Sequence, residues 1–125
     1  MKRINYNITQ EASDRAHRNM KERFRGLSEA ERQSMQALKS LYPIARIEIF
    51  SRDNLEFHTY VFLETNDQVT KSESDGSRER IEEEIYQQLE KVGRGSRPEV
   101  KIRFEYDSAE NVKENFQGSY HLRMR

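Results

Sequence analysis

Histidines and carboxylates are the side chains in this 125-residue sequence that could move protons, because the chain contains no cysteine. His58 and His121 fall in segments whose alternating polar and apolar residues predict strands, and Glu56 precedes His58 by two positions. A histidine beside a carboxylate and an arginine can act as a general acid and base, as in small ribonucleases. Strand histidines are also common without catalysis, so a small hydrolase of ribonuclease type is the weakest of three functional hypotheses.

Sequence motifs for nucleotide, metal and nucleophile chemistry are not found in the chain. It contains no phosphate-binding loop, no dinucleotide fingerprint, no nucleophile elbow and no zinc-protease motif. The lack of cysteine excludes a disulfide framework, a thiol nucleophile and a cysteine-ligated metal, and the histidines and acids do not have ligand spacing. We therefore expect no cofactor and no metal, and we favour a binding protein over an enzyme.

A set of aromatic and basic side chains alternates with the aliphatic residues of the predicted strands. If the apolar side of these strands, which includes Phe57, Val61 and Leu122, faces the core, this set forms the other face of the sheet. Aromatic rings interleaved with bases can stack on nucleobases and neutralise phosphates, which makes a nucleic-acid-binding module the second hypothesis. A second helical layer or a homodimer that covers this face is the alternative. The residues are Phe50, His58, Tyr60, Phe62, Arg103, His121 and Arg123.

Charge is distributed unevenly along the chain, although the formal net charge is zero. Residues 53–90 contain 3 basic and 11 acidic side chains. Residues 1–52 contain 11 basic and 6 acidic ones, and residues 91–125 contain 8 basic and 5 acidic ones. A dipolar charge distribution suits a charged partner better than a neutral small molecule. The simpler alternative is that these charges only solvate the helix surfaces.

The acidic segment contains a predicted helix over about residues 77–92. Ile81, Ile85 and Leu89 recur on one side of it and indicate the face that packs inward. The outward side carries acids around one tyrosine, which is typical of a recognition surface for a basic protein. The first hypothesis is therefore a non-enzymatic binding protein that engages a basic partner protein through this acidic helix. Its most specific version is an immunity- or antitoxin-like protein. Its candidate residues are Glu79, Glu82, Glu83, Tyr86 and Glu90.

Hydrophobic periodicity places these residues on a series of helices and strands. Apolar residues at three- and four-residue spacing predict a helical hairpin over about residues 10–42, with Ser28 and Glu31 as the capping box of its second helix. Alternation predicts a β-hairpin that turns at Arg52–Asn54. After the acidic helix we expect a strand at 99–106, a short helical turn at 112–116 and a final strand at 120–125, with an optional first strand at 3–8.

Together these elements indicate a single α+β domain over residues 1–125, in the order (β)ααββαβ(α)β. Strands that come as hairpins and helices that come in blocks favour a mostly antiparallel sheet of four to five strands. The 35% of charged residues and the mean hydropathy of −1.09 predict a small core under a charged surface. No apolar run is long enough to cross a bilayer and no signal peptide is evident, so we expect a cytoplasmic protein without membrane contact.

Overall fold

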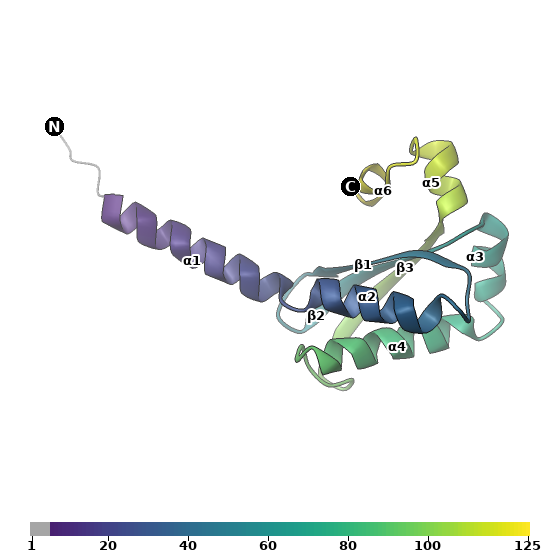
Figure 1. Cartoon of the computed structure of the whole chain (residues 1–125), viewed down its shortest axis with the longest axis horizontal. Helices are drawn as coiled ribbons and strands as arrows, with labels where there is room; N and C mark the ends of the chain where they lie inside the picture. The colour runs from purple at the N-terminus through teal and green to yellow at the C-terminus, as the bar shows by residue number, and fades with distance from the viewer. Residues whose placement is uncertain (1–5) are drawn as a thin grey trace.

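The computed structural model describes the backbone of residues 6–125 and the side chains of residues 10–16, 18 and 21–125. Three strands form one sheet with helices over both faces, and a long N-terminal helix projects from this α+β body (Figure 1). No helix in the described part is long and apolar enough to cross a membrane. The elements are α1 (Tyr6–Phe24), α2 (Leu27–Leu38), β1 (Ile44–Ser51), β2 (Glu56–Leu63), α3 (Asn66–Ser72), α4 (Ser77–Lys91), β3 (Lys101–Ser108), α5 (Ala109–Asn115) and α6 (Tyr120–Met124).

The sheet has the order β1-β2-β3 and contains both strand directions. β1 and β2 form the predicted antiparallel hairpin, with Ile47 opposite Val61 and Phe50 opposite His58. β2 and β3 are parallel, because α3 and α4 return the chain to the end of the sheet at which β2 began. The prediction of a mostly antiparallel sheet is therefore wrong for this pair.

The described residues form three strands, so the prediction of four to five strands is wrong. Residues 120–124 alternate in sequence but form α6, because the Ser119 hydroxyl accepts a hydrogen bond from the Leu122 backbone N–H at 3.2 Å and caps the helix. Leu122, which we expected in the core, is consequently 40% exposed. The optional strand at 3–8 is also wrong where it can be compared, since residues 6–8 belong to α1 and residues 3–5 lie outside the described residues.

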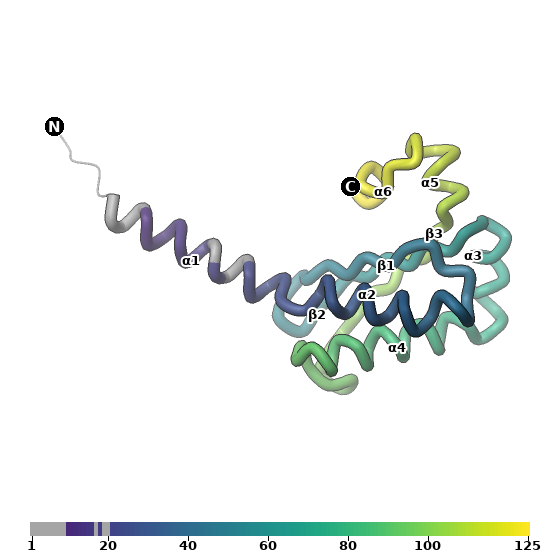
Figure 2. Tube along the Cα trace, viewed as in Figure 1, coloured from purple at the N-terminus to yellow at the C-terminus, as the bar shows by residue number. Residues whose placement is uncertain are grey.

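The two N-terminal helices do not form the predicted helical hairpin. α1 points away from the body while α2 lies against the sheet (Figure 1, Figure 2). Gly26 lies between them with a left-handed φ of 76°, and a Cβ added there would lie 2.8 Å from Val92 Cβ, so this turn requires glycine. Gly26 is also the N-cap of α2 and lacks a side-chain cap. The predicted capping box of Ser28 and Glu31 is therefore wrong, and both residues lie inside the helix.

The hydrophobic core lies between the sheet and the helices α2 and α4. The inward faces predicted for the β-hairpin and the acidic helix are confirmed, because Ile47, Phe57, Val61 and Ile85 are at most 4% exposed. This packing fixes which face of the sheet remains for function. The buried core consists of Leu27, Ala30, Leu38, Ile44, Ile47, Ile49, Phe57, Val61, Leu63, Ile81, Ile85, Leu89 and Val100.

Replacing Phe57 with alanine tests which face of β2 packs inward. Phe57 is 1% exposed, so Phe57→Ala should lower the free energy of unfolding by about 3–5 kcal/mol through lost apolar burial and a residual cavity. Phe50→Ala on the opposite face removes a side chain that is 38% exposed and should cost much less. Urea denaturation of the two variants gives the comparison, and equal losses would contradict the assigned face.

Candidate functional site

The face of the sheet that points away from α2 and α4 is organised in rows by the strand register. Phe50 of β1 lies opposite His58 of β2, and His58 lies opposite Arg103 of β3. This row brings together three of the residues that the sequence predicted for a nucleic-acid surface. The next two rows toward α5 are Glu48–Tyr60–Glu105 and Arg46–Phe62–Asp107.

The half of this face nearest α6 is closed. Phe62 is fully buried, and its ring meets the Tyr120 ring of α6 edge to face with centroids 4.7 Å apart. The Arg46 guanidinium lies 4.6 Å from the centroid of the same tyrosine. Burial raises the pKa of Tyr120. Phe62 therefore belongs to a second apolar layer and is not available for base stacking.

Arg123 connects α6 to the sheet instead of facing a ligand. Its guanidinium donates hydrogen bonds to Glu105 at 2.8 Å and to Asp107. Burial opposes its charge, but these hydrogen bonds and the two carboxylate charges prevail and raise the pKa of Arg123. The predicted phosphate-binding role of Arg123 thus competes with two internal carboxylates. His121, from the same helix, is exposed beside it.

Sequence reasoning missed Glu105 and Asp107 as members of this face. Their positions alone could have indicated this, because side chains alternate along a strand and residues 105 and 107 therefore lie on the same face as Arg103. What the sequence did not reveal is that α6 folds back over β3 and lets Arg123 reach both carboxylates.

The other half of the face is open to solvent. Phe50 is 38% exposed, and its ring meets the Tyr60 ring edge to face at 5.9 Å between centroids. His58 stacks on Tyr60 with centroids 4.5 Å apart. Arg103 is exposed in the same row. We call the residues Phe50, His58, Tyr60 and Arg103, with the exposed cations Arg52 and Lys101 beyond them, the open half-face.

The cations of the open half-face line a shallow hollow at its end. Arg52, Lys101 and Arg103 line it together with one carboxylate, Glu56. None of the three cations lies within ion-pair distance of an acid in the described part of the chain. The open half-face therefore combines one exposed ring, Phe50, and the partly buried rings of His58 and Tyr60 with a local excess of positive charge.

The acid–base arrangement predicted for a hydrolase is not formed as proposed. His58 Nε2 lies 3.3 Å from Glu105 Oε1, within ion-pair distance but not aligned as a hydrogen bond. Glu56 does not lie within ion-pair distance of His58, although the sequence suggested it as the partner. The second histidine, His121, lies on α6 rather than on a strand. His58 and Glu105 remain adjacent, so the sheet keeps one histidine–carboxylate contact.

Part of the recognition surface predicted on the acidic helix α4 contacts other residues of the same chain. Glu82 accepts a hydrogen bond from the Tyr106 hydroxyl at 2.7 Å, and burial together with this bond raises the pKa of Tyr106. Glu83 forms an ion pair with Arg97, whose guanidinium lies 3.9 Å from the Tyr86 ring centroid. Three of the five predicted residues thus contact other parts of the chain, while Glu79 and Glu90 are exposed.

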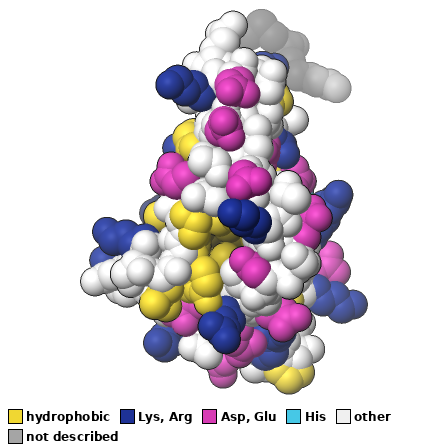
Figure 3. Space-filling model, turned by 90° about the vertical axis from the view of Figure 1, so that its right-hand side faces the viewer, with side chains coloured by type: hydrophobic (Ala, Val, Ile, Leu, Met, Phe, Trp, Pro, Cys, Tyr) yellow, Lys and Arg dark blue, Asp and Glu magenta, His cyan; other side chains and the backbone are white. Residues whose placement is uncertain are grey.

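An apolar hollow lies at the end of the molecule near α3. Figure 3 shows apolar side chains gathered there among basic and acidic ones. Tyr42, Pro43, Leu63 and Ile81 line the hollow together with polar side chains of α3 and α4. No group of three or more histidine, aspartate or glutamate side chains in the described residues could hold a metal ion, there or elsewhere.

Comparisons of the chain with family models, with curated proteins and with solved structures found no match. The function is therefore inferred from the geometry of the two halves of this sheet face and of α4.

Glu31 is a carboxylate with a strongly altered titration at the edge of the sheet. Its Oε2 accepts a hydrogen bond from the backbone N–H of Ile49 in β1 at 3.1 Å. Burial raises the pKa of Glu31 to about 7, the bond from Ile49 opposes this shift, and the neighbouring Glu48 adds to it. Between its ordinary pKa of 4.5 and about pH 7 the folded protein therefore holds a proton on Glu31 that the unfolded chain releases.

Replacing Glu31 with glutamine should change how stability depends on pH. Between its ordinary pKa of 4.5 and about 7, the folded state binds the extra proton, so the free energy of unfolding of the unaltered protein falls as pH rises through this range. Glu31→Gln keeps an oxygen acceptor for Ile49 and does not titrate. The variant should match the unaltered protein near pH 5 and exceed its stability near pH 8 by about 1 kcal/mol, a figure reduced for partial solvation.

Urea denaturation across this pH range measures the effect. Glu114→Gln, which removes an exposed carboxylate of α5, is the control and should leave the pH dependence unchanged. The assigned titration would be wrong if Glu31→Gln and Glu114→Gln gave parallel curves.

Proposed function

We propose that this protein binds single-stranded nucleic acid through the open half-face of its sheet. The observation that supports the proposal is the cross-strand row Phe50–His58–Arg103, in which Phe50 and Arg103 are exposed on either side of the mostly buried His58 while α6 covers the rest of the face. An exposed ring gives a base a surface on which to stack, and a neighbouring guanidinium gives its phosphate a counter-charge.

The chemistry of the open half-face favours a flexible strand over a duplex. Stacking of successive bases on aromatic side chains requires unpaired bases, and it tolerates different sequences because every base has a π-face. The Phe50 and Tyr60 rings approach edge to face with centroids 5.9 Å apart, and Phe50 is 38% exposed, so part of its ring is accessible to a base. Arg52, Lys101 and Arg103 can follow the phosphates beside these rings.

Two substitutions separate the stacking contribution from the electrostatic one. Phe50→Ala should weaken binding of a fluorescein-labelled mixed-sequence RNA or DNA single strand by about 1–3 kcal/mol at every salt concentration, because stacking is lost. Arg103→Gln should weaken binding and reduce the slope of log affinity against log salt by about 0.7, because one phosphate contact is lost. Fluorescence anisotropy between low and moderate salt measures both.

Matched controls come from exposed residues outside the sheet. Phe24→Ala on α1 removes a phenylalanine that is 49% exposed, and Arg80→Gln removes an exposed arginine of α4. Both controls should bind like the unaltered protein. The proposal fails if the unaltered protein does not bind at low salt, or if Phe50→Ala and Arg103→Gln bind as well as their controls.

A second candidate function, recognition of a basic protein through α4, is favoured by the contact of Arg97 with Tyr86. Its guanidinium lies over the tyrosine ring and pairs with Glu83, and both partners of this ion pair are half-exposed. A basic side chain of a partner protein could take the place of Arg97, since the ring and the carboxylate together bind a guanidinium. Exposed Glu79 and Glu90 would steer such a partner.

Reversing the two free acids of α4 tests this second function without disturbing internal contacts. Glu79→Lys with Glu90→Lys leaves the hydrogen bond of Glu82 and the ion pair of Glu83 in place, so the melting temperature should hardly change. A nuclease-treated pull-down should lose basic proteins that the unaltered chain retains. Glu114→Lys is the control, and recovery of the same proteins by all three chains would refute the role of α4.

A further inference from the structure

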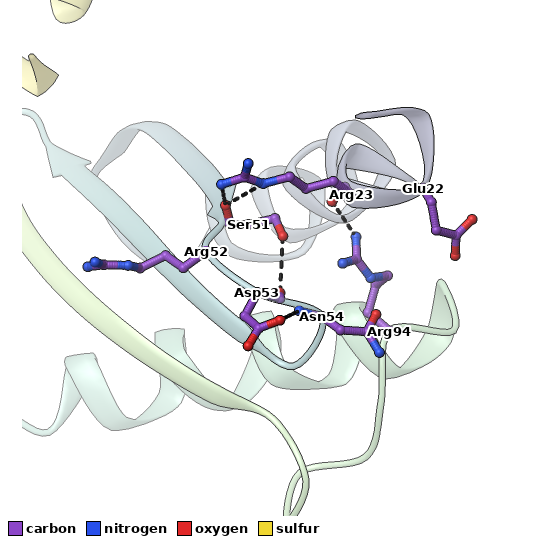
Figure 4. Close-up of a pocket in the computed structure, with 7 residues that line it drawn as sticks. All are labelled: Glu22, Arg23, Ser51, Arg52, Asp53, Asn54 and Arg94. Carbon is purple, nitrogen blue, oxygen red and sulfur yellow. Dashed lines mark hydrogen bonds between the residues drawn. The ribbon is translucent and has the colours of Figure 1, made fainter. Parts of the chain in front are cut away.

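A second group of arginines surrounds a hollow where α1 joins the body. The hollow, of about 300 Å³, is bordered by the last turn of α1, the turn between β1 and β2, and the loop that follows α4 (Figure 4). It shares Arg52 with the open half-face, but Arg23 and Arg94 belong to the hollow alone. Its lining residues are Glu22, Arg23, Ser51, Arg52, Asp53, Asn54 and Arg94.

Arg94 brings a buried positive charge to this hollow. It is 3% exposed, and its Nη1 donates to the backbone carbonyls of Arg23 at 3.0 Å and Arg25 at 2.9 Å, which lie at the end of α1. Its guanidinium also lies 4.9 Å from the Phe57 ring centroid. Burial, together with the nearby charge of Arg25, lowers the pKa of Arg94. The two carbonyls accept hydrogen bonds from Nη1 and, being uncharged, do not neutralise the guanidinium.

Arg23 and Arg52 add two further charges at the border of the same hollow. The Arg23 Nε and Nη2 donate to the Ser51 carbonyl at 3.2 Å and 3.0 Å, again to a backbone oxygen and not to an acid. Arg52 is exposed. Neither these two arginines nor Arg94 lies within ion-pair distance of a carboxylate in the described residues.

The two acids that border the hollow do not balance these charges. Glu22 forms an ion pair with Arg25 at 3.0 Å, and its side chain points away from the other lining residues (Figure 4). Asp53 accepts a hydrogen bond from the Asn54 backbone N–H at 2.7 Å. With Glu22 neutralised by Arg25, the guanidinium groups of Arg23 and Arg94 outnumber the one carboxylate of Asp53, while the Arg52 side chain extends away from the other lining residues (Figure 4).

We propose that this hollow binds a phosphate group. Guanidinium groups present planar pairs of N–H donors that match the oxygens of a phosphate, and the burial of Arg94 strengthens the attraction of its charge to an anion. A phosphate in the hollow would supply the counter-charge that Arg23 and Arg94 lack, and Arg52 at the border would add to the positive field. This site is separate from the open half-face and does not require it, although Arg52 borders both. The phosphate is either free or the terminal group of a nucleotide chain.

Inorganic phosphate is the first probe, and the melting temperature of the full chain is the readout. At matched ionic strength, phosphate should raise the melting temperature of the unaltered protein more than chloride does, because only a specific ligand of the folded state adds to the salt effect. Arg23→Gln should abolish this difference. Arg18→Gln, an exposed arginine of the same helix, should keep it.

A 5′-phosphorylated oligonucleotide, compared with the same strand ending in a hydroxyl, distinguishes the sources of the phosphate. A preference of about tenfold for the phosphorylated strand, lost in Arg23→Gln, assigns the site to a nucleotide end. Protection by inorganic phosphate with equal binding of both strands assigns it to free phosphate. Equal melting temperatures in phosphate and chloride, with no preference for the phosphorylated strand, overturn the proposal whether or not the strands bind the open half-face.

Arg23 is the informative position because it does not border the open half-face. A variant at Arg94 would also remove the cap of α1 and a contact of the buried Phe57 ring, and a loss of binding could then reflect misfolding. The melting temperature of Arg23→Gln in chloride alone shows whether that variant folds. A folded Arg23→Gln that responds to phosphate like the unaltered protein also overturns the proposal.

Discussion

The parallel pairing of β2 with β3 is the constraint on which both faces of the sheet depend. It places Arg103 beside His58 on one face and brings Ile102 and Phe104 against the core on the other. Because side chains alternate along a strand, a shift of one residue in this register would exchange the two faces of β3 and put charged side chains into the core. The same pairing ends at Ser108, where α5 begins, so the register also decides which half of the free face the C-terminal helices cover.

Arginine has three different structural situations in this small domain. Arg123 binds two carboxylates and holds α6 on the sheet. Arg94 is buried against an aromatic ring and two backbone carbonyls that accept hydrogen bonds from its Nη1, and no carboxylate of the described residues neutralises its charge. Arg103 is exposed and lies in no ion pair of the described residues. The amino-acid composition does not distinguish these three arginines. The groups that surround each guanidinium determine whether it stabilises the fold or remains available for an anion.

Local sequence patterns correctly predicted the elements with strong periodicity. They failed where tertiary contacts determine the type of an element or its direction. The alternation in β1 and β2 and the apolar side of α4 correctly identified Phe57, Val61 and Ile85 as core residues. The alternation at residues 120–124 resembled a strand, but a strand needs a neighbour to pair with, and here Ser119 caps a helical turn instead. The helical hairpin failed because the direction of α1 depends on the left-handed Gly26 and on its close approach to Val92, neither of which periodicity contains. For the open half-face, strand parity identified its residues, whereas the coverage of Phe62 by Tyr120 depended on α6.

The contact between Glu31 and the Ile49 amide has a consequence for self-association. β1 is an outer strand of the sheet, and the outward N–H and C=O groups of such a strand can pair with a strand of another molecule and begin an aggregate. The carboxylate of Glu31 already accepts the hydrogen bond of the Ile49 amide, and the charges of Arg46 and Glu48 lie along the same strand. A strand from a second molecule would have to displace this side chain and bring its own backbone against those charges. The helix α2 therefore has two roles: its apolar side covers the core, and its Glu31 protects the edge strand β1 from pairing with a strand of another molecule.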